Sequence, residues 1–506
     1  MIPGKSLLAL LAGAAGPAAF APLGWWPVGL LSTAILFGLW LNSARTAAAW
    51  YGFLYALGLF GVGTSWTYVS LHAFGGMPPV LAGLCVFLLV LAVSLFPAAA
   101  GFVQGVGFDK NRGRRAAVAR AVLVMPGVWV AVEWLRGWLF TGFPWLTTGY
   151  AMLDTPLAGW APVGGVYLVG GLALMTAGAW AALLLGRSRT AGAAALLTGL
   201  GWVGGWQLSA VPWTQAQGEA ISVAIIQNNV PLMLKWDSGH SERIIAEYLE
   251  ASARHRDADL VLWPEAAVPD YLDRLPAAFH RRLREHPADF VFGVLTRRRT
   301  DSASADGDGQ WQYFNSIAVA GRRPDPGAYH KQHLVPFGEF LPIGWLFGPV
   351  VRLLDIPMSD FTAWPRPQRP LRAAGNALAA SICYEDAFPQ EWRAQVPDSG
   401  LLVNLSEDTW FGDSLAPHQR LQMARFRSLE SGRAMLRSSN NGLSSVINWR
   451  GGIDAIAPQF VKAAVTAEVV PRTGVTPYVE HGNRLALVLA AALSVLGWLF
   501  ARRAPG

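Results

Sequence analysis

One cysteine in a polar stretch is the most reactive candidate of this 506-residue chain. Cys383 follows the apolar run 378–382 and precedes Tyr-Glu-Asp, whereas Cys85 lies inside a long apolar run. Two other isolated candidates, Glu265 and Lys331, also follow apolar runs of strand length. A thiol nucleophile needs a base to take its proton, and the oxyanion that it creates needs a cation. The three residue types are therefore the parts of a thiol-dependent acyl-transfer site.

The local sequence favours this use of each residue. The position of Cys383 between a strand and a polar turn exposes a side chain at a sheet edge, beside backbone N–H groups. Pro264 stiffens the approach to Glu265. His330 and His333 flank Lys331, but no carboxylate or thiol stands at a zinc-ligand spacing from them, so we expect no metal and no cofactor.

The composition indicates a membrane protein. The chain is 53% hydrophobic and 14% charged, against about 25% charged residues in soluble proteins. Apolar stretches of membrane-spanning length recur from the start and return near the end. Eight helices are predicted, over residues 6–23, 25–41, 47–69, 79–105, 118–139, 163–186, 191–209 and 485–501.

Basic residues predict how the helices are oriented. They gather in alternate loops, and by the positive-inside rule these loops are cytoplasmic. Both termini are then cytoplasmic, and the segment 210–483 lies outside. Loop charges of this kind explain the net charge of +7, so we expect no nucleic-acid partner. Lys5 and the apolar run after it imitate a signal peptide, but its removal would leave an odd number of spans and break the charge pattern. The loop charges are Lys5, Arg45, Lys110, Arg112, Arg114, Arg115, Arg120, Arg187, Arg189, Arg502 and Arg503.

The segment 210–483 has a different character, because its apolar runs shorten to strand length and alternate with charged helical stretches. Predicted strands cover 221–227, 260–263, 290–295, 316–320, 377–383, 401–405, 443–448 and 464–469, and predicted helices cover 241–255, 275–286 and 417–431. This order indicates an α/β sandwich. The chain then divides into a transmembrane domain (1–212), an extracytoplasmic catalytic domain (213–483), and a last transmembrane helix with a short tail (484–506).

Longer motifs surround the three candidates. Three stretches together resemble the Glu-Lys-Cys signature of the nitrilase superfamily. They are Trp263–Glu265, Lys331 with Leu334–Glu339, and Ile382–Glu385. With membrane spans on both sides, the whole chain resembles the apolipoprotein N-acyltransferase family. Further stretches that carry this resemblance are Asp408–Asp413, Gln422–Arg425, Glu430–Arg433 and Asn440–Gly442.

The resemblance implies a polytopic helical membrane domain that carries a nitrilase-like αββα sandwich in the periplasm of a bacterium. It implies that Glu265 is the base, that Lys331 stabilises the oxyanion and that Cys383 is the nucleophile. Glu339 matches a second glutamate that supports the lysine, and Tyr384, Glu385 and Trp236 match positions associated with activity and substrate access. Glu407 is a departure, because the family more often has Asn between the Ser and the Asp.

The implied reaction has two steps. Cys383 takes an acyl chain from a phospholipid, the sn-1 chain of phosphatidylethanolamine, and forms a thioester. The α-amino group of the diacylglyceryl-cysteine of an apolipoprotein then attacks the thioester, which completes lipoprotein maturation in the inner membrane. Both substrates are anchored in the membrane and could not reach a detached soluble domain, so the membrane spans hold the catalytic domain where the substrates are.

Some features leave alternatives open. The apolar segment 343–361 is expected to be an arm at the bilayer edge that admits lipid, or else ordinary core. A membrane-tethered nitrilase-like amidase would use the same three residues with water as the acceptor. A transporter with an extracytoplasmic binding domain would need ionisable groups inside its spans, and these spans hold few.

Overall fold

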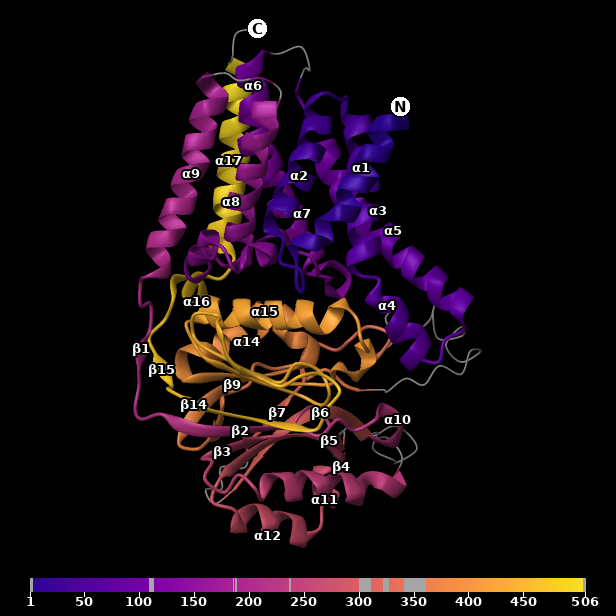
Figure 1. Ribbon diagram of the computed structural model, residues 1–506, viewed down its shortest axis with the longest axis vertical. Helices are drawn as coiled ribbons and strands as arrows, with labels where there is room; N and C mark the ends of the chain where they lie inside the picture. Colours follow the sequence, from indigo (N-terminus) through magenta and orange to yellow (C-terminus); the bar gives the residue numbers. More distant parts are fainter. Residues whose placement is uncertain are drawn as a thin grey trace.

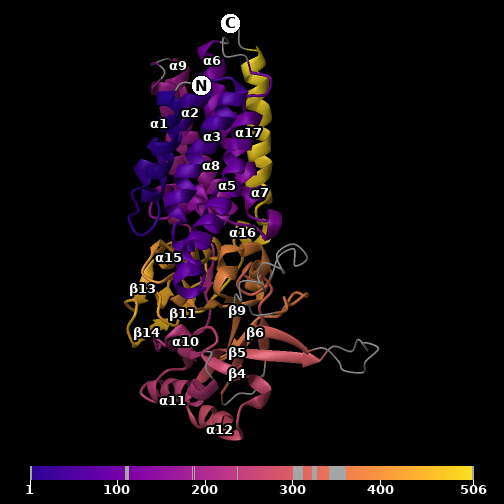
Figure 2. The same ribbon diagram turned by 90° about the vertical axis from the view of Figure 1, so that its right-hand side faces the viewer.

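The helical and the α/β parts of the chain are stacked along the long axis of the molecule (Figure 1). The computed structural model describes residues 3–108, 113–184, 186, 189–235, 238–299, 311–321, 327–340 and 361–503. Both termini lie at the end of the bundle that is remote from the α/β part, and Figure 2 shows the same stacking from the side.

A helix is present at each of the eight places where the sequence predicts one. The bundle consists of α1 (Pro3–Ala15), α2 (Trp26–Leu41), α3 (Arg45–Gly63), α5 (Pro79–Val103), α6 (Arg114–Ala119) continuing into α7 (Met125–Arg136), α8 (Ala161–Leu184), α9 (Arg189–Ser209) and α17 (Arg484–Arg503). The predicted helix 47–69 is wrong at its end, because the chain turns after Gly63 and continues as α4 (Trp66–Val69). Among the described residues, five helices are long and apolar enough to cross a membrane, so eight crossings stay a prediction.

Small residues let the bundle helices approach closely. A Cβ atom built on Gly13 of α1 would overlap the backbone of Tyr55 in α3, and one built on Gly58 would overlap the backbone of Leu10. Close backbone approach of this kind is how helices pack where no hydrophobic effect drives them together.

Two sheets face each other in the α/β part. The larger sheet has the order β14-β2-β3-β5-β6-β7, with β4 paired to β5, and the smaller has the order β13-β12-β11-β10-β9-β8. Apolar side chains of both sheets form one core between them. Helices α11 (Ser241–Ser252) and α12 (Ala277–Glu285) cover the outer face of the larger sheet, and α14 (Pro389–Trp392), α15 (Leu415–Ser431) and α16 (Pro477–His481) lie over the smaller one. The predicted αββα sandwich is confirmed.

Each sheet contains a group of parallel strands. The larger sheet contains β2 (Ile221–Gln227), β3 (Leu260–Leu262), β4 (Val268–Tyr271), β5 (Asp289–Arg299), β6 (Trp311–Ala320), β7 (Ala328–His330) and β14 (Ala463–Val469). The smaller contains β8 (Leu371–Ala373), β9 (Asn376–Ile382), β10 (Leu401–Ser406), β11 (Met435–Ser439), β12 (Ser445–Ile447) and β13 (Ile453–Ile456). Strands β2, β3 and β5 run parallel, as do β9, β10 and β11, so each sheet brings several carboxyl ends to one edge.

A two-stranded sheet of β1 (Gln215–Ala216) and β15 (Arg472–Thr473) connects the entrance and exit of the α/β part. All eight predicted strands are confirmed within a few residues, and the short strands β1, β4, β7, β8, β11, β13 and β15 were not predicted.

Helix α15 joins the two parts of the molecule. It lies across the foot of the bundle (Figure 1), where Gln419 accepts a hydrogen bond from Trp145 Nε1 at 2.6 Å and donates to the carbonyl of Gly63 at 3.1 Å. Near its other end, Glu430 Oε1 accepts the backbone N–H of Val166 in α8 at 2.9 Å. Polar contacts along one helix thus join the two parts, together with apolar packing of Met423 and Phe426 against the bundle.

A buried ion pair supports this junction. Arg427 Nε and Glu430 Oε2 are 2.9 Å apart, and neither side chain is exposed. Removing one partner of such a pair leaves the other charge without compensation, which typically costs about 3 to 5 kcal/mol, whereas removing both is often nearly neutral.

We therefore expect Arg427→Gln to lower the melting temperature of the detergent-solubilised protein strongly, and Arg427→Gln with Glu430→Gln to recover most of the loss. The exposed pair of Arg254 and Glu250 on α11 is the control, and Arg254→Gln should leave the melting temperature unchanged. A double variant that melts as early as the single one would contradict the assignment of this pair as the source of the loss.

Candidate active site

Cys383 begins the short helix η9 (Cys383–Ala387) directly after β9. Its φ of 50° is in the left-handed region, which is unfavourable for a side-chain-bearing residue. Two contacts hold the turn: Glu385 Oε2 accepts the N–H of Ile382 at 2.6 Å, and Asn404 Nδ2 donates to the carbonyl of Cys383 at 3.2 Å. The predicted strand-to-turn position is confirmed.

Glu265 and Lys331 meet at the edge of the larger sheet. Glu265 comes shortly after β3 and follows Pro264 and the fully buried Trp263 in the chain. Lys331 comes directly after β7. Their side chains are 3.4 Å apart (Nζ to Oε1), and both are almost completely buried. The other oxygen of Glu265, Oε2, has no hydrogen-bond partner among the described residues, so it is available to accept a proton.

Glu339 supports the lysine, as the sequence predicts. Its Oε1 lies 2.8 Å from Lys331 Nζ, and its Oε2 accepts the N–H of Val335 at 2.9 Å. Asn315 of β6, which the sequence did not single out, donates from Nδ2 to both glutamates, at 2.7 Å to Glu265 and 3.0 Å to Glu339. This amide fixes the distance between the two carboxylates.

The surroundings decide which group carries a charge. Burial alone would raise the pKa of Glu265, but Lys331 and Asn315 outweigh it and hold the pKa below its ordinary value. Burial would likewise lower the pKa of Lys331, but Glu265 and Glu339 hold it above the ordinary value. Burial raises the pKa of the Cys383 thiol to about 11. At neutral pH the base is therefore ionised and the thiol is protonated.

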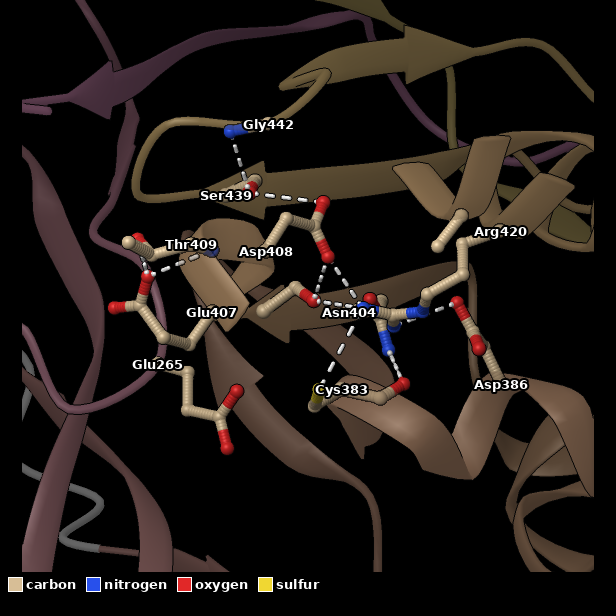
Figure 3. A network of polar contacts seen from close by, with 12 residues as sticks. Glu265, Cys383, Asp386, Asn404, Glu407, Asp408, Thr409, Arg420, Ser439 and Gly442 are labelled. Carbon is tan, nitrogen blue, oxygen red and sulfur yellow. Dashed lines mark hydrogen bonds and ion pairs between the residues drawn. The ribbon is translucent and has the colours of Figure 1, made fainter. Parts of the chain in front are cut away.

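Figure 3 shows a second charged cluster on the other side of Cys383. Arg420 of α15 points Nη1 at Sγ, at 3.5 Å, and bonds Asp408 Oδ1 at 2.5 Å. Arg437 of β11 contacts Asp386 at 2.8 Å and Asp408 at 3.2 Å. Its members come from four separate elements, so local sequence pattern does not predict that they form a cluster.

Tyr384 and Glu385 directly follow Cys383 in the chain and make different contacts. The hydroxyl of Tyr384 donates to the carbonyl of Gly142 in the bundle at 3.2 Å, and its ring lies parallel to that of Trp145, 6.0 Å away. Glu385 accepts the N–H groups of Gln332 at 2.6 Å and His333 at 3.1 Å. Glu385 thus fastens the Lys331 segment to the Cys383 turn.

Two of the predicted features fall outside the described residues. They are Trp236 and residues 343–360 of the predicted arm. His330 Nδ1 contacts Ser316 Oγ at 2.8 Å, and His333 Nδ1 contacts Glu391 at 2.6 Å, so the two imidazoles have separate partners.

Glu407 is linked to Glu265 through Lys235. Its carboxylate forms a buried ion pair with Lys235, whose Nζ also donates to the backbone carbonyl of Glu265 at 2.7 Å. Glu407 Oε1 also accepts from Asn440 Nδ2 at 3.1 Å, and Asn440 binds the backbone of Val230. The pair therefore ties the segment before residue 236 to the floor of the site.

A glutamate and a lysine that follow strands of one sheet of an αββα sandwich, with a cysteine that follows a strand of the other sheet, indicate the nitrilase class. In agreement, the family profile described as carbon-nitrogen hydrolase matches residues 222–478. The profile for the N-terminal domain of apolipoprotein N-acyltransferase matches residues 12–179.

Relatives extend this match to the full length. Apolipoprotein N-acyltransferase of Methylococcus capsulatus is 42% identical over 98% of this chain and 96% of its own. The protein of the same name from Nitrosomonas europaea is 38% identical over 98% and 97%. Among solved structures, Saccharomyces cerevisiae Nit3, a member of branch 10 of the nitrilase superfamily, covers 51% of this chain and 93% of its own, with 14% identity and a TM-score of 0.36. The chain belongs to the apolipoprotein N-acyltransferase family and is an acyltransferase with a membrane domain.

The Glu407 pair gives a test of how the base is positioned. Glu407→Gln leaves the Lys235 ammonium buried without its carboxylate, so we expect a lower melting temperature and a first acylation step slowed about tenfold. Lys235→Met with Glu407→Gln should recover the melting temperature but not the rate, because the Glu265 carbonyl stays without its donor. The partly exposed pair of Lys462 and Glu247 is the control, and Glu247→Gln should change neither quantity.

Proposed function

We propose that this chain transfers a fatty acyl chain from a phospholipid, through a thioester on Cys383, to the α-amino group of a diacylglyceryl-cysteine at the N-terminus of an apolipoprotein. The observation that carries the proposal is the buried contact of Glu265 with Lys331 and of Lys331 with Glu339, close to a thiol whose neighbour Tyr384 contacts the membrane part at Gly142. Full-length similarity to apolipoprotein N-acyltransferases supports it.

The first step begins with transfer of the thiol proton to Glu265. The Cys383 sulfur then attacks the ester carbonyl of the phospholipid, and Lys331 stabilises the oxyanion. When the carbon–oxygen bond breaks, the glycerol oxygen takes the proton from Glu265 and leaves as a lysophospholipid.

In the second step the amine attacks the thioester carbonyl and passes a proton to Glu265. The carbon–sulfur bond breaks, its electron pair returns to sulfur, the sulfur takes the proton back from Glu265, and the amide product is released. Glu385, Tyr384 and Trp236 serve this reaction by shaping the site and its access, and the donor is phosphatidylethanolamine acting through its sn-1 chain.

The proposal includes an orientation. Residues 1–212 and 484–506 form the transmembrane part of a bacterial inner-membrane protein with both termini in the cytoplasm, and residues 213–483 form the catalytic domain in the periplasm. The alternating loop charges support this arrangement, as does the position of both termini at the end of the bundle remote from the α/β part.

The defining test is intact-mass spectrometry of the purified protein mixed with phosphatidylethanolamine, with Cys383→Ala as the control. We expect one fatty-acyl adduct that hydroxylamine removes, that is absent in Cys383→Ala, and that a diacylglyceryl peptide takes up. An adduct that decays at the same rate with and without the peptide would favour the amidase. A folded protein that forms no adduct would refute the proposal.

The role of Glu265 has its own signature. Its lowered pKa keeps the carboxylate ionised through the neutral range, so the rate of the first step should be lost only as the pH falls below the ordinary range of a glutamate. In Glu265→Gln, the thiol must ionise unaided, so the rate should rise about tenfold per pH unit between about pH 6 and 9. A flat pH profile of Glu265→Gln, measured by stopped reactions and mass spectrometry, would exclude Glu265 as the base.

A further inference from the structure

Arg420 is the charged group in direct contact with the candidate nucleophile. Its Nη1 lies 3.5 Å from Cys383 Sγ, and the arginine side chain is completely buried. Among the described residues, no other hydrogen bond to this sulfur is found. Figure 3 shows the Glu265 carboxylate on one side of Cys383 and the Arg420 guanidinium on the other.

The guanidinium is held firmly in this place. Its Nη1 also donates to Ser406 Oγ at 2.6 Å and to Asp408 Oδ1 at 2.5 Å, and its Nη2 donates to Asp386 at 3.4 Å. Arg437 binds the same two aspartates from β11, so two cations and two anions compensate each other. A buried charge that is paired in this way keeps its position while the charge on the sulfur changes.

Lys331 is placed differently, because it is shared between two carboxylates on the larger sheet. The groups that act electrostatically on the thiol are Glu265, Lys331, Asp408 and Arg420, and the two carboxylates both oppose its ionisation. Arg420 favours ionisation most strongly, against a burial that raises the pKa of the thiol. A separate cation for the sulfur leaves Lys331 for the oxyanion.

We propose that Arg420 is a further catalytic residue, which binds the Cys383 thiolate each time it forms. The inference rests on the proposed function, in which Cys383 is the nucleophile. When Glu265 takes the thiol proton, the negative charge moves to sulfur and faces Arg420 until the carbon–sulfur bond forms. When the amine attacks, the electron pair of that bond returns to sulfur, and Arg420 stabilises the departing thiolate again.

The test is the pH dependence of Cys383 alkylation by iodoacetamide, measured on full-length protein in detergent by intact mass. Cys85→Ser serves as the parent, so that a single cysteine reacts. In Arg420→Gln we expect the thiol pKa to rise by about one unit or more, which lowers the alkylation rate near pH 8 about tenfold. Arg420→Lys should retain part of the rate, because it keeps the positive charge.

Helix α15 offers a matched control. Arg427 is also buried and ion-paired, but it contacts Glu430 and not Cys383. Arg427→Gln with Glu430→Gln should leave the alkylation profile within about twofold of the parent. If Arg420→Gln does not fold, Arg420→Gln with Asp408→Asn keeps the buried cluster neutral and is compared with the same control.

The outcomes separate the two proposals. A profile in the folded Arg420 variant that matches the parent, or an equal shift in the Arg427 control, would overturn the role of Arg420 while acyl transfer through Cys383 stands. An acyl chain that attaches to Cys383→Ala would refute the proposed function itself. A shift confined to the Arg420 variants, accompanied by an equally slower first step with phospholipid, would establish the residue as the thiolate partner.

Discussion

The arrangement of this site depends on one constraint, which is that charged groups buried away from water need partners that stay in place. The α/β part meets this constraint on both sides of Cys383. On the larger sheet, Lys331 is compensated by Glu265 and Glu339. On the smaller sheet, Arg420 and Arg437 are compensated by Asp386 and Asp408. Cys383 lies where the two clusters approach each other, so the thiol can change its charge in surroundings that do not have to rearrange.

Helix α15 relates this electrostatic arrangement to the membrane part. Residues on one helix reach both the thiol, through Arg420, and the foot of the bundle, through Gln419 and Glu430. Because one rigid helix carries both sets of contacts, it fixes the position of the Cys383 sulfur relative to the bundle. Placement of reacting groups to within a fraction of an ångström is what such support provides. Helix α15 therefore both places a charge next to the thiol and joins the α/β part to the bundle.

The sequence predicted the features that depend on local pattern. Apolar runs predicted the bundle helices and eight strands, and residue type and position singled out Glu265, Lys331 and Cys383, of which Glu265 and Lys331 are in contact. Strand β11 was missed because Arg437 and the serines that follow it are polar but fully buried, so no alternation marks the strand. Buried polar strands are recognisable only when their partners are known.

The missed site residues have the same cause. Arg420 and Asn315 lie in a helix and a strand whose local sequence is unremarkable, and each becomes important only through a contact made across long sequence separation, 37 residues to Cys383 and 50 to Glu265. Glu407 stood out as a departure, but its role required Lys235 as the partner, 172 residues away. Residue type and spacing thus predict the groups that react, whereas the groups that tune them follow from the fold.

The contacts of Tyr384 bring the membrane part close to the residue that carries the acyl chain in the proposed reaction. A thioester can be attacked by water as well as by an amine, so a transferase has to keep water away from its acyl-enzyme. Tyr384 directly follows the nucleophile, donates to Gly142 of the bundle and stacks on Trp145, so one wall of the site is built from the membrane part. A soluble sandwich with the same three reactive residues has no such wall. In the proposed reaction this wall lies close to the acyl-enzyme, so the membrane part would exclude water from the thioester as well as anchor the enzyme.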